Sequence, residues 1–380
     1  MIYLDHNATT RLAPEVLAEM MPYLQGCYAN PSSVYSQGRV AREGINKARE
    51  QVAKLVNAHP SQVIFTSGGS EANNLAIKGC IQGMGLSRLI TGVTEHPSVR
   101  DVAAYFSSSL QLQTLSVDAQ GVVDADEVQR AAAPGSQALV SLMMANNETG
   151  VIQNVVEIAG RFQNLGHFVH TDAVQAAGKL NLDFSQLNVN LLTLSAHKIY
   201  GPKGIGALIF DKKIDIEPMI FGGGQEKKLR SGTENVAAIV GFGKAAELAR
   251  LNLSKNVTRL KNLQIYFEQQ LMLLPGIVIF SEQAERLPNT TFFAVPGIDG
   301  ETLLMQLDVE GIAVASGSAC ASMSLKPSHV LMAMGVDEQT ARSAIRVSFG
   351  LNNTEAEIDQ LICAIKMQIE MIASLDVLEV

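Results

Sequence analysis

Apolar, strand-like runs alternate with helix-like segments along residues 60–215, and this alternation limits the possible folds more than any other feature of the chain. The strand-like runs lie at residues 63–66, 88–90, 138–144, 168–170, 191–195 and 205–210, and the helix-like segments at 71–79, 99–106 and 156–165. Alternation of this kind predicts a mostly parallel sheet with helices on both faces. Ligands of such sheets bind beyond the carboxyl ends of the strands.

The pattern changes beyond about residue 255, where short strand-like pieces mix with helices. A helical stretch near 257–273 precedes strand-like pieces at 277–280, 290–294, 312–314 and 345–349. The last helix begins with a capping box, Thr354-Glu355-Ala356-Glu357, and continues with apolar residues at helical spacing. Because 380 residues exceed what one core usually serves, we expect two domains. They are a large α/β domain at 12–255 and a small α+β domain formed by residues 1–11 and 256–380.

The composition argues against nucleic acid or a membrane as a partner. The formal net charge of -8 gives no electrostatic attraction to either, and no apolar run reaches membrane-spanning length. The first six residues lack the basic and apolar regions of a secretory signal. The 4 cysteines have no metal-ligand spacing, so we expect free thiols, a reducing compartment and a cytoplasmic protein without a permanent metal.

Polar clusters follow the predicted strands directly, at the edge where a ligand would bind. They are Ser67–Ser70, Glu95-His96, Asn146-Asn147, Asp172–Gln175 and Ser195–Lys198. Because the carboxyl ends of parallel strands meet at one edge of a sheet, we expect these clusters to form a single site.

Lys198 lies between an apolar strand and a glycine-rich turn, which is an unusual place for a charge. A lysine there can form a Schiff base with a carbonyl cofactor, and Asp172, at the end of the preceding strand, can keep a pyridinium nitrogen protonated. This pair is the minimum that pyridoxal phosphate chemistry requires of a protein. The alternative for Lys198 alone is an ordinary surface lysine beside a turn.

Four further polar groups have both a ligand role and a simpler explanation. Ser67-Gly68-Gly69-Ser70-Glu71 can bind phosphate at a helix start, or Ser70 can only cap that helix. His96 can stack on a planar ring and move protons, or be a loop histidine without a role. Asn147 and Gln175 can donate to a phenolic oxygen, or shape a turn and cap a helix respectively.

Two residues of the C-terminal part also point to chemistry. Small residues surround Cys320 in Ser316-Gly317-Ser318-Ala319-Cys320-Ala321-Ser322, which indicates an accessible thiol, whereas the alternative is an incidental cysteine in a strand-to-helix connection. Arg346 lies within an apolar strand and is expected to pair with a carboxylate, either internal or of a ligand. The other cysteines have apolar neighbours and are predicted to be small core residues: Cys27, Cys80 and Cys363.

The sequence resembles the pyridoxal-phosphate-dependent cysteine desulfurases of the NifS/IscS type, which belong to the class V aminotransferase superfamily of fold type I. The resemblance runs nearly end to end. It rests on these motifs in this order: Tyr3-Leu4-Asp5-His6-Asn7-Ala8-Thr9-Thr10, Phe65-Thr66-Ser67-Gly68-Gly69-Ser70-Glu71-Ala72-Asn73-Asn74, Thr94-Glu95-His96, Asn146-Asn147-Glu148-Thr149-Gly150, His170-Thr171-Asp172-Ala173-Val174-Gln175, Ser195-Ala196-His197-Lys198, Arg230-Ser231-Gly232-Thr233-Glu234-Asn235 and Gly317-Ser318-Ala319-Cys320.

The resemblance implies a role for each matching residue in binding pyridoxal phosphate. Lys198 corresponds to the Schiff-base lysine and proton carrier, Asp172 to the partner of the ring nitrogen, and His96 to the stacking histidine. The ligands of the phosphate are implied to be Gly69, Ser70, Ser195 and His197. Gln175 and Asn147 correspond to ligands of the phenolic oxygen and the substrate. Thr233 matches a threonine that comes from a second subunit, which implies a homodimer.

The resemblance also implies the reaction. Arg346 would bind the carboxylate of L-cysteine, and Cys320 would take its sulfur as a persulfide, leaving L-alanine. The segment from Ala321 to Pro327 has the length of a long mobile loop, which could deliver sulfur to an iron–sulfur scaffold protein or a tRNA-thiolation protein, and Cys320 could ligate a cluster transiently. Position 70 is Ser where the family more often has Thr, and Tyr35 stands where relatives often have His. Alternative functions are a selenocysteine lyase, another class V lyase or aminotransferase, or a binding protein without activity.

Overall fold

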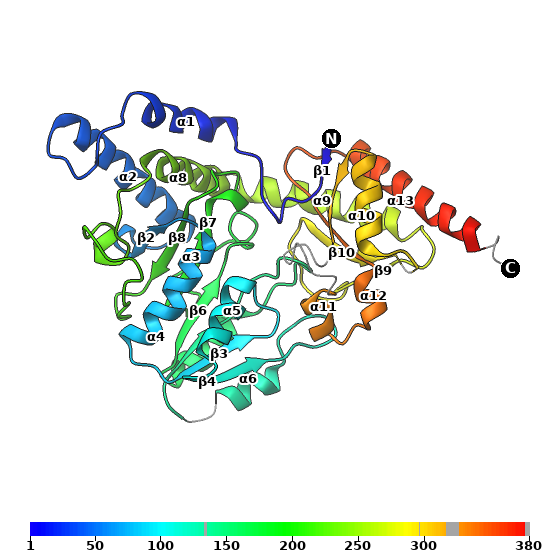
Figure 1. Ribbon diagram of the computed structural model, residues 1–380, viewed down its shortest axis with the longest axis horizontal. Coiled ribbons are helices and arrows are strands. Elements are labelled where there is room, and N and C mark those ends of the chain that lie inside the picture. Colours follow the sequence, from blue (N-terminus) through cyan, green and yellow to red (C-terminus); the bar gives the residue numbers. More distant parts are fainter. Residues whose placement is uncertain (133–134, 296, 317–326, 377–380) are drawn as a thin grey trace.

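The computed structural model describes residues 1–132, 135–295, 297–316 and 327–376, and of residues 372–376 it describes the backbone alone. Its larger sheet has seven strands in the order β2-β8-β7-β6-β5-β3-β4 (Figure 1). Their bounds are β2 Val63–Thr66, β3 Arg88–Gly92, β4 Gln111–Leu115, β5 Ala138–Ser141, β6 Phe168–Asp172, β7 Leu191–Ser195 and β8 Gly206–Phe210. Every pair from β7 to β4 is parallel, and β8 is antiparallel to both of its neighbours. The predicted mostly parallel sheet is confirmed.

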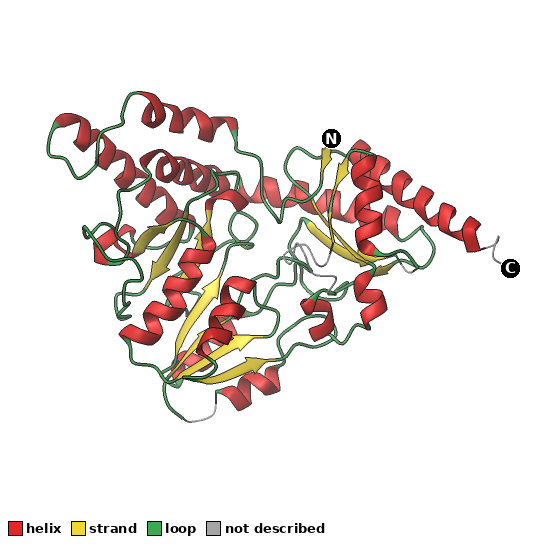
Figure 2. Ribbon diagram, viewed as in Figure 1, coloured by secondary structure: helices red, strands yellow, loops and turns green. Residues whose placement is uncertain are grey.

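Helices cover both faces of this sheet, as Figure 2 shows. Along β2, Val63 and Phe65 belong to one apolar cluster and Ile64 to another, because successive strand residues point to opposite faces. The helices of this part are α1 Pro14–Gln25, α2 Ser36–Leu55, α3 Gly69–Asn74, α4 Cys80–Gly83, α5 Pro97–Phe106, α6 Ala125–Ala131, α7 Val155–Asn164 and α8 Val236–Leu251, with a π-helical turn at Leu75–Gly79 between α3 and α4.

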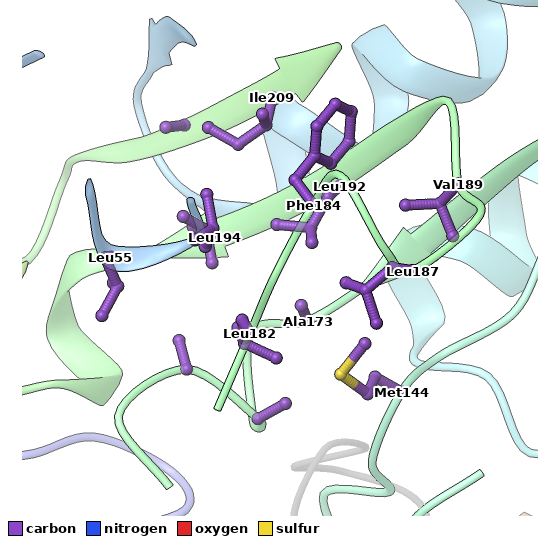
Figure 3. Packing of buried hydrophobic residues seen from close by; sticks show 14 of the residues in the cluster. Leu55, Met144, Ala173, Leu182, Phe184, Leu187, Val189, Leu192, Leu194 and Ile209 are labelled. Atoms are coloured by element: carbon purple, nitrogen blue, oxygen red, sulfur yellow. The ribbon is translucent and has the colours of Figure 1, made fainter. Parts of the chain in front are cut away.

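The larger cluster packs strand side chains against the connection between β6 and β7 (Figure 3). Leu192 and Leu194 of β7 are fully buried there, and Phe184 and Leu187 of the connection also belong to this cluster. These side chains keep the carboxyl end of β7 in a fixed position, and Lys198 follows that end directly.

The smaller sheets are built from the C-terminal part of the chain and the first residues. Antiparallel strands pair in the order β12-β13-β10-β9, and β1 pairs with β11 in parallel. Their bounds are β1 Ile2–Tyr3, β9 Val278–Ile279, β10 Thr290–Ala294, β11 Ile312–Ala313, β12 Ala315–Ser316 and β13 Ala344–Ser348. The accompanying helices are α9 Leu253–Leu271, α10 Gly300–Val309, α11 His329–Ala333, α12 Glu338–Arg342 and α13 Glu355–Asp376. The N–H of Thr354 donates to Glu357 at 2.9 Å and the N–H of Glu357 to the Thr354 hydroxyl at 3.3 Å, which confirms the capping box.

The N-terminal segment crosses from the small sheets to the large one. Asp5 forms a bridge with Ser348, and the N–H of Thr10 donates to the carbonyl of His197 at 2.9 Å. α8 and α9 meet at Asn252, which ends one helix and precedes the other. We propose that the chain divides near this point, into residues 12–255 and residues 1–11 with 256–380.

Three details differ from the sequence-based expectation. Edge strand β4 was not predicted, because its residues Gln111–Leu115 are mostly polar and exposed. The strand expected at 138–144 ends at Ser141, although the N–H groups of Leu142 and Met144 still donate to the carboxyl end of β6. Cys80 is buried as predicted, but Cys363 is exposed because the helical repeat turns its neighbours Leu361 and Ala364 inward. Within the described part of the chain, no helix is long and apolar enough to span a membrane.

Candidate active site

A cavity of about 350 Å³ lies beyond the carboxyl ends of β5, β6 and β7, and the polar clusters that follow the strands converge on it. The predicted site residues that line it are Gly69, Ser70, His96, Asn147, Asp172, Gln175, Ser195, His197, Lys198 and Arg346. Residues to which the sequence analysis gave no individual role line it too: Asn7, Ala8, Asn73, Ser98, Met143, Ala145 and Val174. Residues from all five polar clusters thus line one cavity.

Lys198 is half-buried at the end of a short helical turn, Ala196–Lys198, that follows β7 directly. Its amine donates to the carbonyl of Ala8 at 2.7 Å and also to the carbonyl of Asn7. An ordinary surface lysine would point to solvent, whereas this amine is held inside the cavity by two carbonyl groups of the N-terminal segment.

Asp172 ends β6 and is 7% exposed. One carboxylate oxygen accepts from the Asn73 amide at 2.7 Å, and the other from the N–H of Val174 at 3.0 Å. The two donors hold both oxygens of this carboxylate in place. The cavity therefore has the Asp172 carboxylate at one wall and the Lys198 amine at another.

His96 precedes α5 and caps it, because its Nδ1 accepts from the N–H of Ser98 at 3.1 Å. The Ser98 hydroxyl lies 2.8 Å from the same nitrogen. Burial lowers the pKa of the His96 imidazole, with Asp172 opposing and Lys198 adding to the effect. The ring is thus fixed and favours its neutral form.

The hydrogen-bond partners of Gln175 determine which end of its side-chain amide is the nitrogen and which is the oxygen. Its Nε2 donates to the carbonyl of Asn7 at 2.9 Å, and its Oε1 accepts from the Lys179 amine at 3.3 Å. A lysine can only donate and a carbonyl can only accept, so the amide cannot be flipped. Its second N–H remains to serve a ligand in the cavity. Lys179, which the sequence did not indicate, is therefore part of the support of this site.

A phosphate group fits the start of α3. There the Ser195 hydroxyl is buried and has no hydrogen-bond partner among the residues that the structure describes. A side chain at Gly69 would meet Val174 at 3.0 Å, so the glycine leaves room beside Ser195. A second hollow of about 350 Å³ continues from Ser195 past His197 to Lys203. An unpaired hydroxyl, the N–H groups at a helix start and a nearby lysine are the groups that bind phosphate.

Arg346 has an internal carboxylate as its partner. Its guanidinium donates to Asp5 at 2.6 Å and to the carbonyl of Asn147 at 2.9 Å. Its Nε is buried without a partner within the described part of the chain. Of the two alternatives for this arginine, the internal pair is present, and the residue also lines the cavity.

One predicted site residue does not line this cavity, and another cannot be placed relative to it. Thr233 is exposed and does not line it, so the same chain does not supply this residue to its own site. Cys320 lies outside the described residues. The N-terminal segment, whose carbonyls hold Lys198, is the main part of the site that sequence reasoning missed, although Asn7 and Ala8 stand within a motif that carries the family resemblance.

Comparison with known proteins agrees with this arrangement. The model of the family described as aminotransferase class-V matches residues 2–361. The chain belongs to the class-V aminotransferase family. This class-V protein is 40% identical over 378 residues to the cysteine desulfurase IscS of Dictyoglomus turgidum, covering 98% of this chain and 96% of that one. It is 43% identical over 364 residues to a cysteine desulfurase of Trichormus azollae, covering 95% and 91%.

Solved structures resemble the class-V chain over nearly its whole length. A NifS-like protein superposes with a TM-score of 0.92 at 37% identity, covering 97% of this chain and 99% of that one. A structure described as SspA in complex with cysteine superposes with a TM-score of 0.81 at 32% identity, covering 92% and 99%. Members of this family use pyridoxal phosphate, and so does this chain. The carboxylate, the amine and the unpaired Ser195 hydroxyl are the groups that this cofactor requires.

Proposed function

We propose that this cysteine desulfurase transfers the sulfur of L-cysteine to Cys320, so that L-cysteine and the thiol give L-alanine and a persulfide. The observation that carries the proposal is the placement of Lys198 and Asp172 on the walls of one cavity, next to the unpaired hydroxyl of Ser195. The full-length similarity to cysteine desulfurases and the neighbour described in complex with cysteine support the choice of substrate.

Pyridoxal phosphate, when bound, supplies an electron sink for the bond changes at the substrate Cα and Cβ. Lys198 would hold it covalently, and Asp172 would keep its ring nitrogen protonated. Gln175 would donate its free N–H to the phenolic oxygen, while Asn147 would contact this oxygen and the substrate. The phosphate would lie against a set of groups at the start of α3 and the end of β7: Gly69, Ser70, Ser195 and His197.

The protein's own side chains then bind the substrate and move protons. Arg346 binds the carboxylate of L-cysteine with its guanidinium, which lines the cavity and is oriented by Asp5 and the carbonyl of Asn147. Lys198 moves the proton at the substrate Cα, and the carbonyls of Asn7 and Ala8 keep its amine in reach. The Cys320 thiolate attacks the substrate sulfur and forms the new S–S bond as the C–S bond breaks.

The remaining proposals concern the subunit partner, the sulfur acceptor and the cellular location. Thr233 acts from the second subunit of a homodimer, because in its own subunit it is exposed and away from the cavity. The persulfide passes to an acceptor protein of iron–sulfur cluster assembly or of tRNA thiolation, in the cytoplasm. Selenocysteine lyase is the alternative activity at the same residues.

The decisive experiment mixes the holoenzyme with L-cysteine, quantifies L-alanine and locates the added sulfur by mass spectrometry of tryptic peptides. We expect one added sulfur atom on the peptide that carries Cys320, and loss of persulfide in Cys320→Ala. Cys363→Ala is the matched control, since Cys363 is an exposed cysteine of α13. Sulfur release that is unchanged in Cys320→Ala would show that the nucleophile is wrong. A Lys198→Ala protein that keeps full activity would refute the proposed chemistry as a whole.

A further inference from the structure

Asp172 and His96 are joined by a continuous chain of hydrogen bonds through Asn73 and Ser98. The Asn73 amide donates to Asp172 at 2.7 Å and to the Ser98 hydroxyl at 2.8 Å. The Ser98 hydroxyl lies 2.8 Å from Nδ1 of His96. Asn73 is 1% exposed and Asp172 is 7% exposed, so solvent does not compete strongly for these contacts.

The direction of each hydrogen bond in this chain follows from its chemistry. A carboxylate only accepts, so the Asn73 nitrogen must face Asp172. Because the same nitrogen donates to the Ser98 oxygen, the serine's own proton is directed away from Asn73 and is available to Nδ1 of His96, 2.8 Å away. The N–H of Ser98 also donates to this nitrogen, at 3.1 Å. A proton on Nδ1 would break the hydrogen bond from the Ser98 N–H, which can only donate, and would require the hydroxyl to turn and accept, so the unprotonated Nδ1 is favoured.

We propose that Ser98 is a positioning residue which, held by Asn73, keeps His96 in the tautomer with its proton on Nε2, so that the ring presents an N–H hydrogen-bond donor to the cavity. Nδ1 faces the start of α5, and Nε2 is the ring nitrogen that remains for groups in the cavity. A neutral ring of this kind donates a hydrogen bond to a group in the cavity through Nε2 and does not act there as a base. The inference deepens the role that the family resemblance implies for His96, and it rests on the proposed function.

The chain contains a second His-Pro-Ser sequence with the same local geometry. Nδ1 of His59 accepts from the N–H of Ser61 at 3.1 Å and lies 2.7 Å from the Ser61 hydroxyl. His59 is exposed and far from the cavity, and it precedes a short helical turn, Pro60–Gln62, as its N-cap. The His-Pro-Ser sequence alone therefore places a serine beside Nδ1. The buried Asn73 amide, which turns the serine proton away from itself, is present only beside His96 among these two motifs.

Charged groups from several elements surround the His96 ring. Asp172 and Asp101 favour the protonated ring, while Lys198 and Arg100 oppose it. His329 of α11 is also close enough to interact with His96 electrostatically. Since these charges oppose one another, the ring tautomer is determined mainly by the directed hydrogen bonds at Nδ1.

The test is ¹⁵N NMR of the apoprotein labelled on its histidine rings, with the His96 signals assigned from a His96→Gln spectrum. In the wild type we expect Nδ1 of His96 at the shift of an unprotonated nitrogen and Nε2 at that of a protonated one. Ser98→Ala removes one of the two donors, and since one such hydrogen bond contributes about 1 kcal/mol, the fraction of the other tautomer should rise about fivefold. Ser98→Thr keeps the hydroxyl and should restore the wild-type shifts.

Ser61→Ala is the matched control, because it should change the His59 signals and leave those of His96 unchanged. A wild-type His96 with its proton on Nδ1 would overturn the inference, as would a folded Ser98→Ala protein with unchanged His96 shifts. The wild-type measurement decides even if Ser98→Ala does not fold. The apoprotein spectrum does not depend on activity. Full desulfurase activity in His96→Gln would therefore refute the role of His96 in the reaction, whereas the tautomer is tested by the spectrum alone.

Discussion

Asp5 and Arg346, which lie at opposite ends of the chain, form an ion pair of 2.6 Å beside the active-site cavity. The two side chains are 18% and 5% exposed, so the pair is largely buried. The contact joins the N-terminal segment to β13 and also orients the guanidinium that we propose as the substrate carboxylate ligand.

Asp5→Asn should therefore destabilise the protein strongly, because it leaves the Arg346 cation buried without its counter-ion. Removing one partner of a buried pair costs about 3 kcal/mol or more in the free energy of unfolding. Urea denaturation followed by circular dichroism measures this loss. The exposed Asp308→Asn on α10 is the control, and equal stability of the two variants would show that the pair contributes little.

Lys179→Met should change how stability depends on pH. Burial lowers the pKa of the Lys179 amine to about 7, and the neighbouring cations Lys198 and Arg346 add to the effect. Between pH 7 and the ordinary lysine pKa of about 10.4, the unfolded chain binds a proton that the folded protein lacks, so stability rises with pH in this window. The wild type should gain on the variant by up to about 1.4 kcal/mol per pH unit there. Urea denaturation of both proteins at each pH measures this, with the exposed Lys54→Met as the control. A difference in unfolding free energy between wild type and Lys179→Met that stays constant with pH would contradict the prediction.

Glu148→Gln should remove a pH dependence of stability that has the opposite sign and lies at lower pH. Burial raises the pKa of the Glu148 carboxyl to about 7, against the hydrogen bond from Ser328 and the charge of Arg346, which lower it. Between pH 4.5 and 7 the folded protein holds a proton that the unfolded chain has lost, so this contribution to stability is complete below pH 4.5 and disappears as the pH rises through 7. The wild type should lose stability relative to the variant across this window. Thermal unfolding at several pH values measures the difference, and the exposed Glu50→Gln should show none.

Gly206→Ala should weaken the binding of pyridoxal phosphate. A side chain at Gly206 would lie 2.6 Å from the backbone of Gly68 and 2.8 Å from the carbonyl of Leu194, so the turn before α3 would have to shift. Overpacking of this kind costs about 1–3 kcal/mol. Absorbance titration of the apoprotein with pyridoxal phosphate should show at least about a fivefold weaker affinity. Gly26→Ala, where the nearest atom is 3.8 Å away, should bind normally, and equal affinities would refute the prediction.

The sequence predicted the part of the site that follows the strands and missed the part that depends on contacts between distant segments. His96, Asp172 and Lys198 were found because each comes directly after an apolar run, and the parallel sheet places such ends together. Asn7 and Ala8 contribute backbone carbonyls, which any residue type supplies, so composition and spacing could not indicate them. The identity of the Arg346 partner was also open, because nothing local in β13 points to Asp5. Ser98 had a local signal, the repeated His-Pro-Ser sequence, but its orientation by Asn73 needed the fold.

The contacts of residues 5–10 have a consequence for the order in which the nascent chain matures. The ribosome releases this segment well before its hydrogen-bond partners Arg346 and Ser348, which are translated 341 residues later than Asp5 and Asn7 respectively. Until they emerge, the segment has its contacts with Gln175 and His197 but lacks those that join it to β13, so the carbonyls that orient the Lys198 amine are less firmly held. Binding of the cofactor should therefore follow the translation of β13. A product that is truncated before β13 would be released from the ribosome but would not retain the cofactor.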